Sequence, residues 1–579
     1  TGTENTAVGK SALSTNTTAS NNTAVGKSAL NWNTGADNTA IGRAALFTNT
    51  TGANMTAVGY NALYANTTGS SSVAVGKEAL DANTTGNWNV AVGRNALGAN
   101  TTADANVAVG HDTLSANTTG THNTAVGYNS LVLNTTTNYN TAFGSLTLAA
   151  NVANANTAVG YNVLNDNTTG ERNTAMGTAA LDSCTTGSYN TSIGAYSLSA
   201  GVTGDSNTAV GDNAMYDLTS GANNVAIGNN TLDEITTGTW NTAVGSGAMA
   251  ATSTGVNYNN AFGYQALLST TGSKNCAFGY QALGASTAGN FNSVFGHEAG
   301  EAVTTGEYNV FMGMEAGKAT TTGDDNTAVG SLALDANTTG DHNVALGHNS
   351  LGTNSTGNFN VAVGSYALYD NTSNDNTAIG YNSLGNNTTG TTNVAVGKDS
   401  LTDNTTGYDN TAIGESALES NTTGFENTAV GQSALTSATT GQGNVAVGHQ
   451  ALRVVSTSDW NVGLGEWAGQ DITSGANNVC LGYASGSSDS PNGSLTTGSN
   501  YIVMGNNSHT HAYIKIDWTV TSDRRDKTDI EPFNHGLSWI NKLNPVTYRW
   551  DNRSDYEDGV PDGSKKGSQL NVGLIAQEE

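Results

Sequence analysis

The chain has 579 residues, of which 72 are glycine, 4 are proline and only 11% are charged. Hydrophobic residues make up 36% of the chain, a low share for a set of compact globular domains. The share of charged residues is also low, whereas disordered chains combine low hydrophobicity with many charges, so the composition is not that of a disordered chain either. The net charge of −27 argues against a nucleic-acid partner. No apolar run reaches the roughly 18 residues that a membrane-spanning helix needs, so membrane insertion is not expected.

A short motif, Asn-Thr-Ala-Val-Gly, recurs along most of the chain and first occurs at Asn5–Gly9. Its glycine serves as the anchor of each repeat, and 30 such anchors run from Gly9 to Gly505. Successive anchors are 16, 17 or 18 residues apart as far as Gly482, and the last step is longer. The working consensus is N-T-A-V-G-x-x-A-L-x-x-N-T-T-G-x-x. A repeat of this length predicts a solenoid.

Apolar residues keep fixed places within the repeat. The residue before the anchor glycine is apolar in every copy, as at Val8 and Ile41, and Leu or Met follows four residues after the anchor in nearly every copy. The copies that lack this residue have Gly300, Gly317, Gly469, Gly486 and His509 in its place. We therefore expect each coil to bury about one Val, one Leu and two Ala.

The repeat sequence is rich in strand and turn residues. Asn-Thr-Ala-Val-Gly predicts a short strand that ends in a turn, and Asn-Thr-Thr-Gly predicts a second short extended segment and turn. A single helical turn at Gly-x-x-Ala-Leu is the alternative for the intervening segment. About 30 coils stacked at roughly 4.8 Å give a rod of about 140 Å, with Asn and Thr side chains in ladders. The predicted fold is an all-β, elongated parallel β-solenoid or β-roll.

The predicted core of each coil is thin for a solenoid that stands alone, because ordering each residue costs on the order of 1–2 kcal/mol. The small Ala positions would let backbones of different chains approach closely. We therefore expect a homotrimer, with a monomeric rod as the alternative. The three cysteines lie many repeats apart, so disulfides within the chain are not expected; they are Cys184, Cys276 and Cys480.

The repeats resemble the head repeats of trimeric autotransporter adhesins, which carry Ala-Val/Ile-Gly after Asn-Ser/Thr. The resemblance spans residues 5–482, although the period is longer in this chain. It implies a parallel β-roll wound as a trimer.

The composition changes near residue 490. All four prolines lie beyond this point, and 9 of the 19 Lys and Arg residues lie after Gly505. Alternating apolar and polar residues at Ile514–Val520 predict a strand. The predicted organisation is a repeat shaft over residues 1–482, a neck with short strands over 483–521, and a further segment over 522–579.

Three motifs occur in order in the last segment. They are S-D-R-R-D-K at Ser522–Lys527, L-N-P-V-T-Y at Leu543–Tyr548, and G-L-I-A-Q-E at Gly573–Glu578. This order resembles the intramolecular chaperone of endosialidase family. The resemblance implies a partial, small α+β chaperone segment that trimerises, guides folding of the preceding fibre and then cuts itself off.

The same resemblance implies that Ser522 is the nucleophile, that Lys527 is its base, and that the chain is cut between Thr521 and Ser522. A serine hydroxyl needs a base to become a nucleophile, and a lysine can act as that base only if its pKa is lowered. Asp526 and Asp529 flank Lys527 and would raise its pKa if they were close in space. The alternative is that Ser522 and Lys527 only cap and solubilise a helix. Any enzyme activity would therefore be a single autoproteolytic event.

Two histidines in the neck are a candidate metal site. His509 and His511 form a His-x-His motif, and on a strand both imidazoles would point to the same side. In a trimer, six such nitrogens near the axis could hold one metal ion. The alternative is that both histidines are exposed residues without a ligand, and no other cofactor is expected.

Aromatic residues recur directly before the motif asparagine. In a solenoid they would lie along one edge and offer flat apolar faces to sugar rings. The alternative is that each ring covers the neighbouring coil. The candidates for glycan contact are Trp88, Tyr189, Trp240 and Trp460.

These features predict the trimeric shaft of a viral (phage) tail fibre, located in the virion and outside cells. The expected partners are two further copies of the chain, a host cell-surface glycan or protein receptor, and other virion tail proteins. A bacterial surface trimeric adhesin is the first alternative. A glycan-degrading tailspike whose catalytic part lies elsewhere is the second, because residues 5–482 contain no insertion large enough to build a catalytic pocket.

Overall fold

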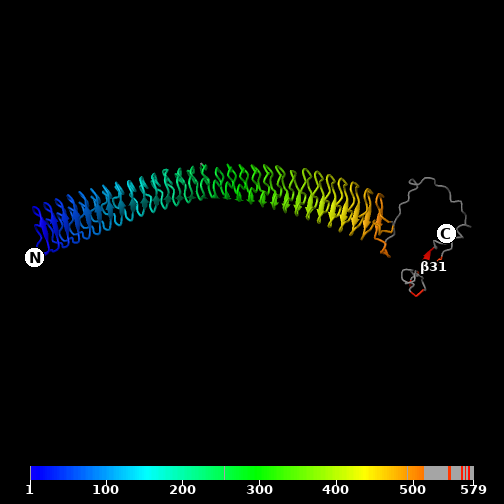
Figure 1. Cartoon of the computed structure of the whole chain (residues 1–579), viewed down its shortest axis with the longest axis horizontal. Coiled ribbons are helices and arrows are strands. Elements are labelled where there is room, and N and C mark those ends of the chain that lie inside the picture. The colour runs from blue at the N-terminus through cyan, green and yellow to red at the C-terminus, as the bar shows by residue number, and fades with distance from the viewer. Residues whose placement is uncertain are drawn as a thin grey trace. The chain divides into compact units, whose positions relative to one another are not determined.

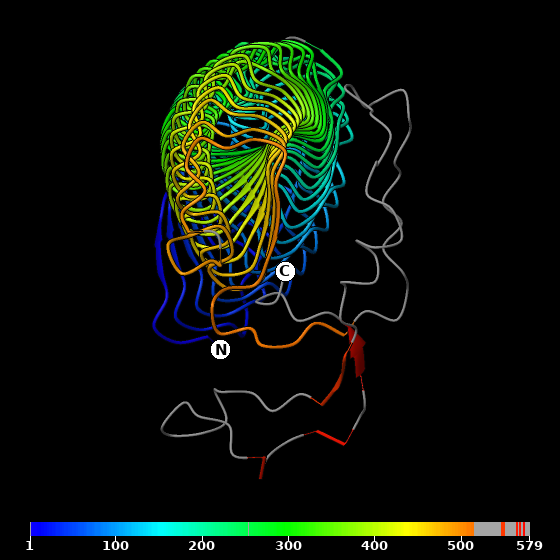
Figure 2. The same cartoon turned by 90° about the vertical axis from the view of Figure 1, so that its right-hand side faces the viewer.

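The structure is a computed structural model in which the chain forms two compact units, Thr1–His509 and Thr510–Glu579. In the first unit, the chain winds as a continuous stack of similar coils that curves gently along its length (Figure 1). Viewed towards the end of the stack, successive coils superimpose as flattened rings (Figure 2). The residues described are 2–252, 254–491, 493–513, 546–549, 563–564, 567–568 and 571–573.

Each coil contributes one strand of three residues to a single 30-stranded sheet. The strands are β1 Thr6–Val8, β2 Thr23–Val25, β3 Thr39–Ile41, β4 Thr56–Val58, β5 Val73–Val75, β6 Val90–Val92, β7 Val107–Val109, β8 Thr124–Val126, β9 Thr141–Phe143, β10 Thr157–Val159, β11 Thr174–Met176, β12 Thr191–Ile193, β13 Thr208–Val210, β14 Val225–Ile227, β15 Thr242–Val244, β16 Asn260–Phe262, β17 Cys276–Phe278, β18 Ser293–Phe295, β19 Val310–Met312, β20 Thr327–Val329, β21 Val344–Leu346, β22 Val361–Val363, β23 Thr377–Ile379, β24 Val394–Val396, β25 Thr411–Ile413, β26 Thr428–Val430, β27 Val445–Val447, β28 Val462–Leu464, β29 Val479–Leu481 and β30 Ile502–Met504. In the second unit, β31 is Val546–Tyr548 and β32 is Asn571–Gly573.

Neighbouring coils pair in parallel with equivalent positions opposite one another. For example, Ala7 lies opposite Ala24, and Val8 lies opposite Val25. The predicted parallel β-solenoid is thereby confirmed. At Asn-Thr-Thr-Gly, where a second short extended segment and turn were predicted, the chain forms bends and no strand. The described residues contain no helix, neither at Gly-x-x-Ala-Leu nor of a kind that could cross a membrane.

Positions within a coil are numbered from the anchor glycine, so that the residue after it is +1 and the residue before it is −1. The interior is filled by the strand's central alanine at −2 and by the residues at +3 and +4, as shown by Ala24, Ala29 and Leu30, which are all 0% exposed. The apolar residue at −1 was expected inside, and this is wrong. Val8 is 57% exposed and Ile41 is 41% exposed, because alternate residues of a strand point to opposite faces and alanine takes the inner face.

The anchor glycine is required by both its backbone angle and its surroundings. Gly194 has φ of +140°, and a Cβ added to it would lie 2.1 Å from the carbonyl oxygen of Gly211 in the next coil. No other residue adopts such an angle without strain. The stack therefore depends on a glycine at this point of each coil.

Two asparagine ladders run through the interior. At −4, Asn343 donates from its backbone N–H to Oδ1 of Asn326 in the preceding coil (3.0 Å), and its Nδ2 donates to the carbonyl of Gly357 (2.8 Å). At +7, Nδ2 of Asn404 donates to Oδ1 of Asn387 (2.7 Å). All four of these asparagines are fully buried. The predicted asparagine ladders are confirmed, and they satisfy polar groups that would be costly to bury alone.

Two of the copies without Leu at +4, those with Gly300 and Gly317, are compensated from a neighbouring position. Phe311 occupies −2, where most coils have alanine, and it is fully buried. A Cβ on Gly300 would lie 3.0 Å from the Phe311 ring, and one on Gly317 would lie 2.6 Å from it. The phenylalanine ring thus fills the space that two leucine side chains would otherwise occupy.

Candidate functional site

In the second unit, a strand pair brings two of the C-terminal motifs together. β31 pairs antiparallel with β32, and Val546 lies opposite Gly573. Val546 belongs to the second motif and Gly573 begins the third. Nη1 of Arg549, directly after β31, donates to the carbonyl of Ser568.

The predicted self-cleavage residues lie outside the described residues. These are Thr521, Ser522 and Lys527, and the flanking Asp526 and Asp529 are also outside, as is the predicted strand at 514–520. Their roles stay predictions.

The His-x-His motif is placed in irregular structure. His509 and His511 belong to no strand, so the expectation that a strand aims both rings to one side is wrong. Nδ1 of His509 accepts the backbone N–H of Asn506 (3.0 Å), and Nδ1 of His511 lies 2.9 Å from Oγ1 of Thr510. The described residues contain no group of three or more His, Cys, Asp or Glu side chains that could hold a metal ion. A metal shared by three chains stays a prediction.

The four aromatic residues predicted to contact glycans lie at −5 of their coils. All are well exposed: Trp88 by 64%, Tyr189 by 54%, Trp240 by 55% and Trp460 by 58%. They are separated by at least three coils, which is about 14 Å along the stack. The structure therefore brings no two of them together, and each would make its own contact.

Where two adjacent coils both have an aromatic ring at −5, the ring of one coil stacks on the ring of the next. Phe291 stacks on Tyr308 with ring centroids 4.8 Å apart, and His122 stacks on Tyr139 at 5.4 Å. Such stacking contributes to stability beyond the area that it buries. Stacking between coils thus explains some of the aromatic residues along this edge.

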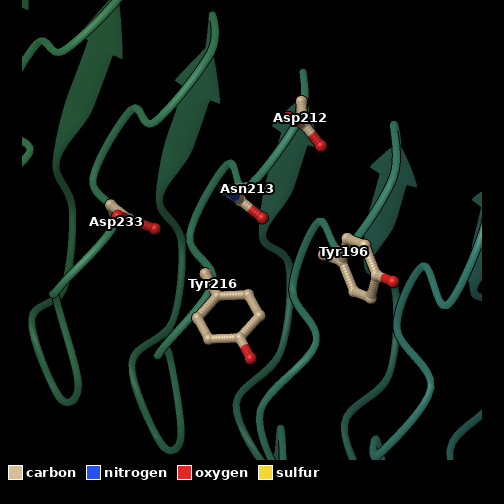
Figure 3. A pocket seen from close by; sticks show the side chains of 5 residues that line it. All are labelled: Tyr196, Asp212, Asn213, Tyr216 and Asp233. Atoms are coloured by element: carbon tan, nitrogen blue, oxygen red, sulfur yellow. The ribbon is translucent and has the colours of Figure 1, made fainter.

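Two hollows lie at equivalent places in the repeat, between the residues at +1 and +2 and those at +5. Figure 3 shows one of them, formed by three successive coils. It is lined by Tyr196, Asp212, Asn213, Tyr216 and Asp233. Two phenol rings and two carboxyl groups thus share one hollow.

Asp233 has the most unusual environment in this hollow. Its Oδ1 is buried without a hydrogen-bond partner in the described part of the chain. Burial, and then the neighbouring charges of Asp217 and Glu234, raise the pKa of its carboxyl group. The hollow is therefore acidic and repels anions.

The second hollow lies near the N-terminus and is basic. It is lined by Lys27, Ser28, Arg43, Ala44, Phe47, Tyr60, Asn61 and Tyr64. Phe47 and Tyr64 stack with ring centroids 5.3 Å apart, and the Arg43 guanidinium lies 5.4 Å from the centre of the Tyr60 ring. The sequence-based predictions missed this hollow, although aligning the repeats on the anchor glycine would have revealed it, because Lys27 and Arg43 both occupy +1.

The outer face of the sheet is an apolar stripe. It consists of the residues at −1, none of which is buried, and it extends from Val8 in β1 to Met504 in β30. In its middle, the rings of Phe262, Phe278 and Phe295 stack at 4.5 and 4.9 Å. An exposed apolar face that runs along the whole sheet is typical of an interaction surface.

Comparison with known proteins identifies the C-terminal segment. A family model described as chaperone of endosialidase matches residues 522–578. The segment is similar to that chaperone. The resemblance drawn from the three motifs is thereby confirmed for this part of the chain. No curated protein matches the chain.

Proposed function

We propose that this protein is the shaft of a homotrimeric phage tail fibre that contributes to host attachment. In this proposal, the chaperone segment guides the assembly of three chains. The observation that carries it is the match of residues 522–578 to the chaperone of endosialidase, directly after a 30-stranded solenoid. The expected location is the virion tail, outside cells.

The regularity of the solenoid is a reason for an assembly chaperone. Every coil presents nearly the same residues to its neighbour, as in the pairing of Ala24 with Ala40 and of Ala40 with Ala57. Two chains displaced by one coil would therefore make nearly the same contacts along their whole length. A domain that trimerises at one end would fix the register before such slips form.

The outer apolar stripe supports association of the chains. The alanines at −2 were expected to let chains approach, but they are wholly inside their own coils, as Ala24 and Ala40 illustrate. The outward residues at −1 are apolar and those at −3 are mostly Thr or Val, and none of them is buried in the single chain. We propose that the trimer buries this stripe, which would contribute roughly 25 cal/mol per Å² of apolar surface removed from water.

The repeats themselves favour a second candidate, a trimeric adhesin of the bacterial surface. The Asn-Thr-Ala-Val-Gly motif that resembles adhesin heads occurs over residues 5–482. Both candidates share a trimeric shaft and surface attachment. They differ in self-cleavage, which belongs to the chaperone.

The deciding experiment is the intact mass, under denaturing conditions, of the protein beside a Ser522→Ala variant. In the proposed reaction, Lys527 takes the proton of the Ser522 hydroxyl, and the hydroxyl oxygen attacks the carbonyl carbon of Thr521. The Ser522 nitrogen leaves with that proton, and water then hydrolyses the ester, so that the cut chain ends at the Thr521 carboxylate. We expect a fragment ending at Thr521 in the wild type and none in the variant. Two uncut masses would contradict the cleavage. Light scattering of the same two proteins under native conditions should give three chains per particle, and a monomer would contradict the trimeric shaft.

A further inference from the structure

The few cations of the N-terminal coils lie in one row. The chain has only 19 Lys and Arg residues against 46 Asp and Glu, yet five of these cations occur within the first six repeats, and each occupies +1. This cation row consists of Lys10, Lys27, Arg43, Lys77 and Arg94. In the fourth repeat the same position is taken by Tyr60.

Backbone hydrogen bonds hold the cation row in register. The carbonyl of Lys10 accepts the N–H of Ser28 in the next coil (2.8 Å), and the carbonyl of Lys27 accepts that of Ala44 (2.9 Å). The carbonyl of Arg43 continues the same pattern. Equivalent residues of adjacent coils are thus about 4.8 Å apart, and the row extends over roughly 24 Å. Because the coils stack in register, the charged residues at +1 form a straight line.

Most of this charge is not neutralised within the chain. Lys10, Lys27 and Arg43 are exposed, and within the described ranges none has a carboxylate at ion-pair distance. Lys77 pairs with Glu78 at 3.4 Å but keeps 54% of its side chain exposed. Three adjacent like charges repel one another, so an external anion that binds across them is favoured.

Aromatic rings lie beside the row. The Arg43 guanidinium is 5.4 Å from the centre of the Tyr60 ring and the Lys77 ammonium is 5.9 Å from it. Across the basic hollow, the stacked pair of Phe47 and Tyr64 offers further apolar surface. Sugar rings stack on such faces, while their acid groups need cations.

We propose that the cation row and the basic hollow bind an acidic polysaccharide. Its chain lies along the stack, with carboxylates on Lys10, Lys27 and Arg43 and with sugar rings against Tyr60 and the Phe47–Tyr64 pair. A nucleic acid is disfavoured, because duplex DNA carries about one charge per 1.7 Å, far denser than the row's one cation per roughly 4.8 Å, and the protein's net charge of −27 repels the denser polyanion more strongly. The chain bends at each anchor glycine; the cation row follows this glycine, whereas the sheet face proposed to be buried in the trimer precedes it.

The inference depends on the proposed attachment function for its biological setting only. Oligomeric state and cleavage are measured separately from binding, so failure of one proposal is distinguishable from failure of the other. Retained binding in a protein that is neither trimeric nor cut would support the binding site alone.

The test is binding of the full chain to an immobilised polyuronate such as alginate, with neutral dextran and single-stranded oligo(dT) as comparisons. We expect binding to alginate that weakens as salt increases, and little binding to dextran. The double variant Lys27→Gln, Arg43→Gln should lose about ten-fold in affinity, as two exposed charge contacts imply. Tyr60→Ala should also weaken binding, although it leaves the charge unchanged.

The matched control is Lys398→Gln. Lys398 also occupies +1, but it stands apart from other row cations and pairs with Asp399 at 3.1 Å, so its loss should leave alginate binding unchanged. Circular dichroism should show that all variants stay folded. The proposal is overturned if alginate binds no better than dextran, if oligo(dT) binds more tightly, or if Lys27→Gln and Lys398→Gln have equal effects.

Discussion

Replacing one anchor glycine by alanine should separate two neighbouring coils. In Gly194→Ala, the new Cβ would lie 2.1 Å from the carbonyl oxygen of Gly211, whereas real Cβ atoms essentially never come closer than 3.0 Å to another heavy atom. The coils must therefore move apart by about 1 Å at this point. Two backbone hydrogen bonds lie on either side of Gly194. The N–H of Gly211 donates to the carbonyl of Ile193 (2.7 Å), and the N–H of Asn213 donates to the carbonyl of Ala195 (3.0 Å).

The cost follows from these contacts. Each buried backbone hydrogen bond that is lost costs about 1–3 kcal/mol, and a side chain at φ of +140° adds about 1–3 kcal/mol of backbone strain. The total is at least about 3 kcal/mol. Because each coil contacts mainly its neighbours, the damage should stay local.

Hydrogen exchange measures this effect directly. The amides of Gly211 and Asn213 should exchange more than about 100-fold faster in Gly194→Ala, while amides of distant coils keep their protection. The control is Gly201→Ala in the same coil, where the added Cβ would meet no atom closer than the Ser183 carbonyl oxygen at 3.9 Å. Wild-type protection of Gly211 and Asn213 in Gly194→Ala would refute the reasoning.

Three further predictions concern the interior and the acidic hollow. Phe311→Ala should cost about 3–5 kcal/mol in urea unfolding, and adding Gly317→Leu should restore part of it; no recovery would contradict the compensation. Burial raises the pKa of Cys184 to about 12 and of Cys480 to about 11, so both thiols should resist Ellman's reagent at pH 8 until the chain unfolds. Burial raises the pKa of the Asp233 carboxyl group. The charged carboxylate therefore lowers the free energy of unfolding at pH values above this raised pKa, and this destabilisation disappears below the group's ordinary pKa of 3.8. Asp233→Asn should therefore raise the melting temperature at pH 7 but not at pH 3, and equal effects at both would argue against this cause.

The sequence by itself determined the period, the parallel stacking and the asparagine ladders. Each follows from local rules, because a glycine-ended strand motif that returns every 17 residues or so has one regular way to pair with itself. The three C-terminal motifs likewise identified the chaperone segment, since their residues and order are specific. The self-cleavage residues Ser522 and Lys527 were predicted from this resemblance alone.

Only the tertiary structure decided which apolar residues are inside. Positions −2 and −1 are both apolar, as at Ala7 and Val8, so the pattern does not show which face of the strand is the inner one. The narrow interior, already filled by residues such as Leu30 and the buried asparagines, has room for alanine and leaves valine outside. Stacking also converts a position of the repeat into a line in space. The cation row from Lys10 to Arg94 exists because equivalent residues of successive coils lie one strand spacing apart, although they are about 17 residues apart in the sequence.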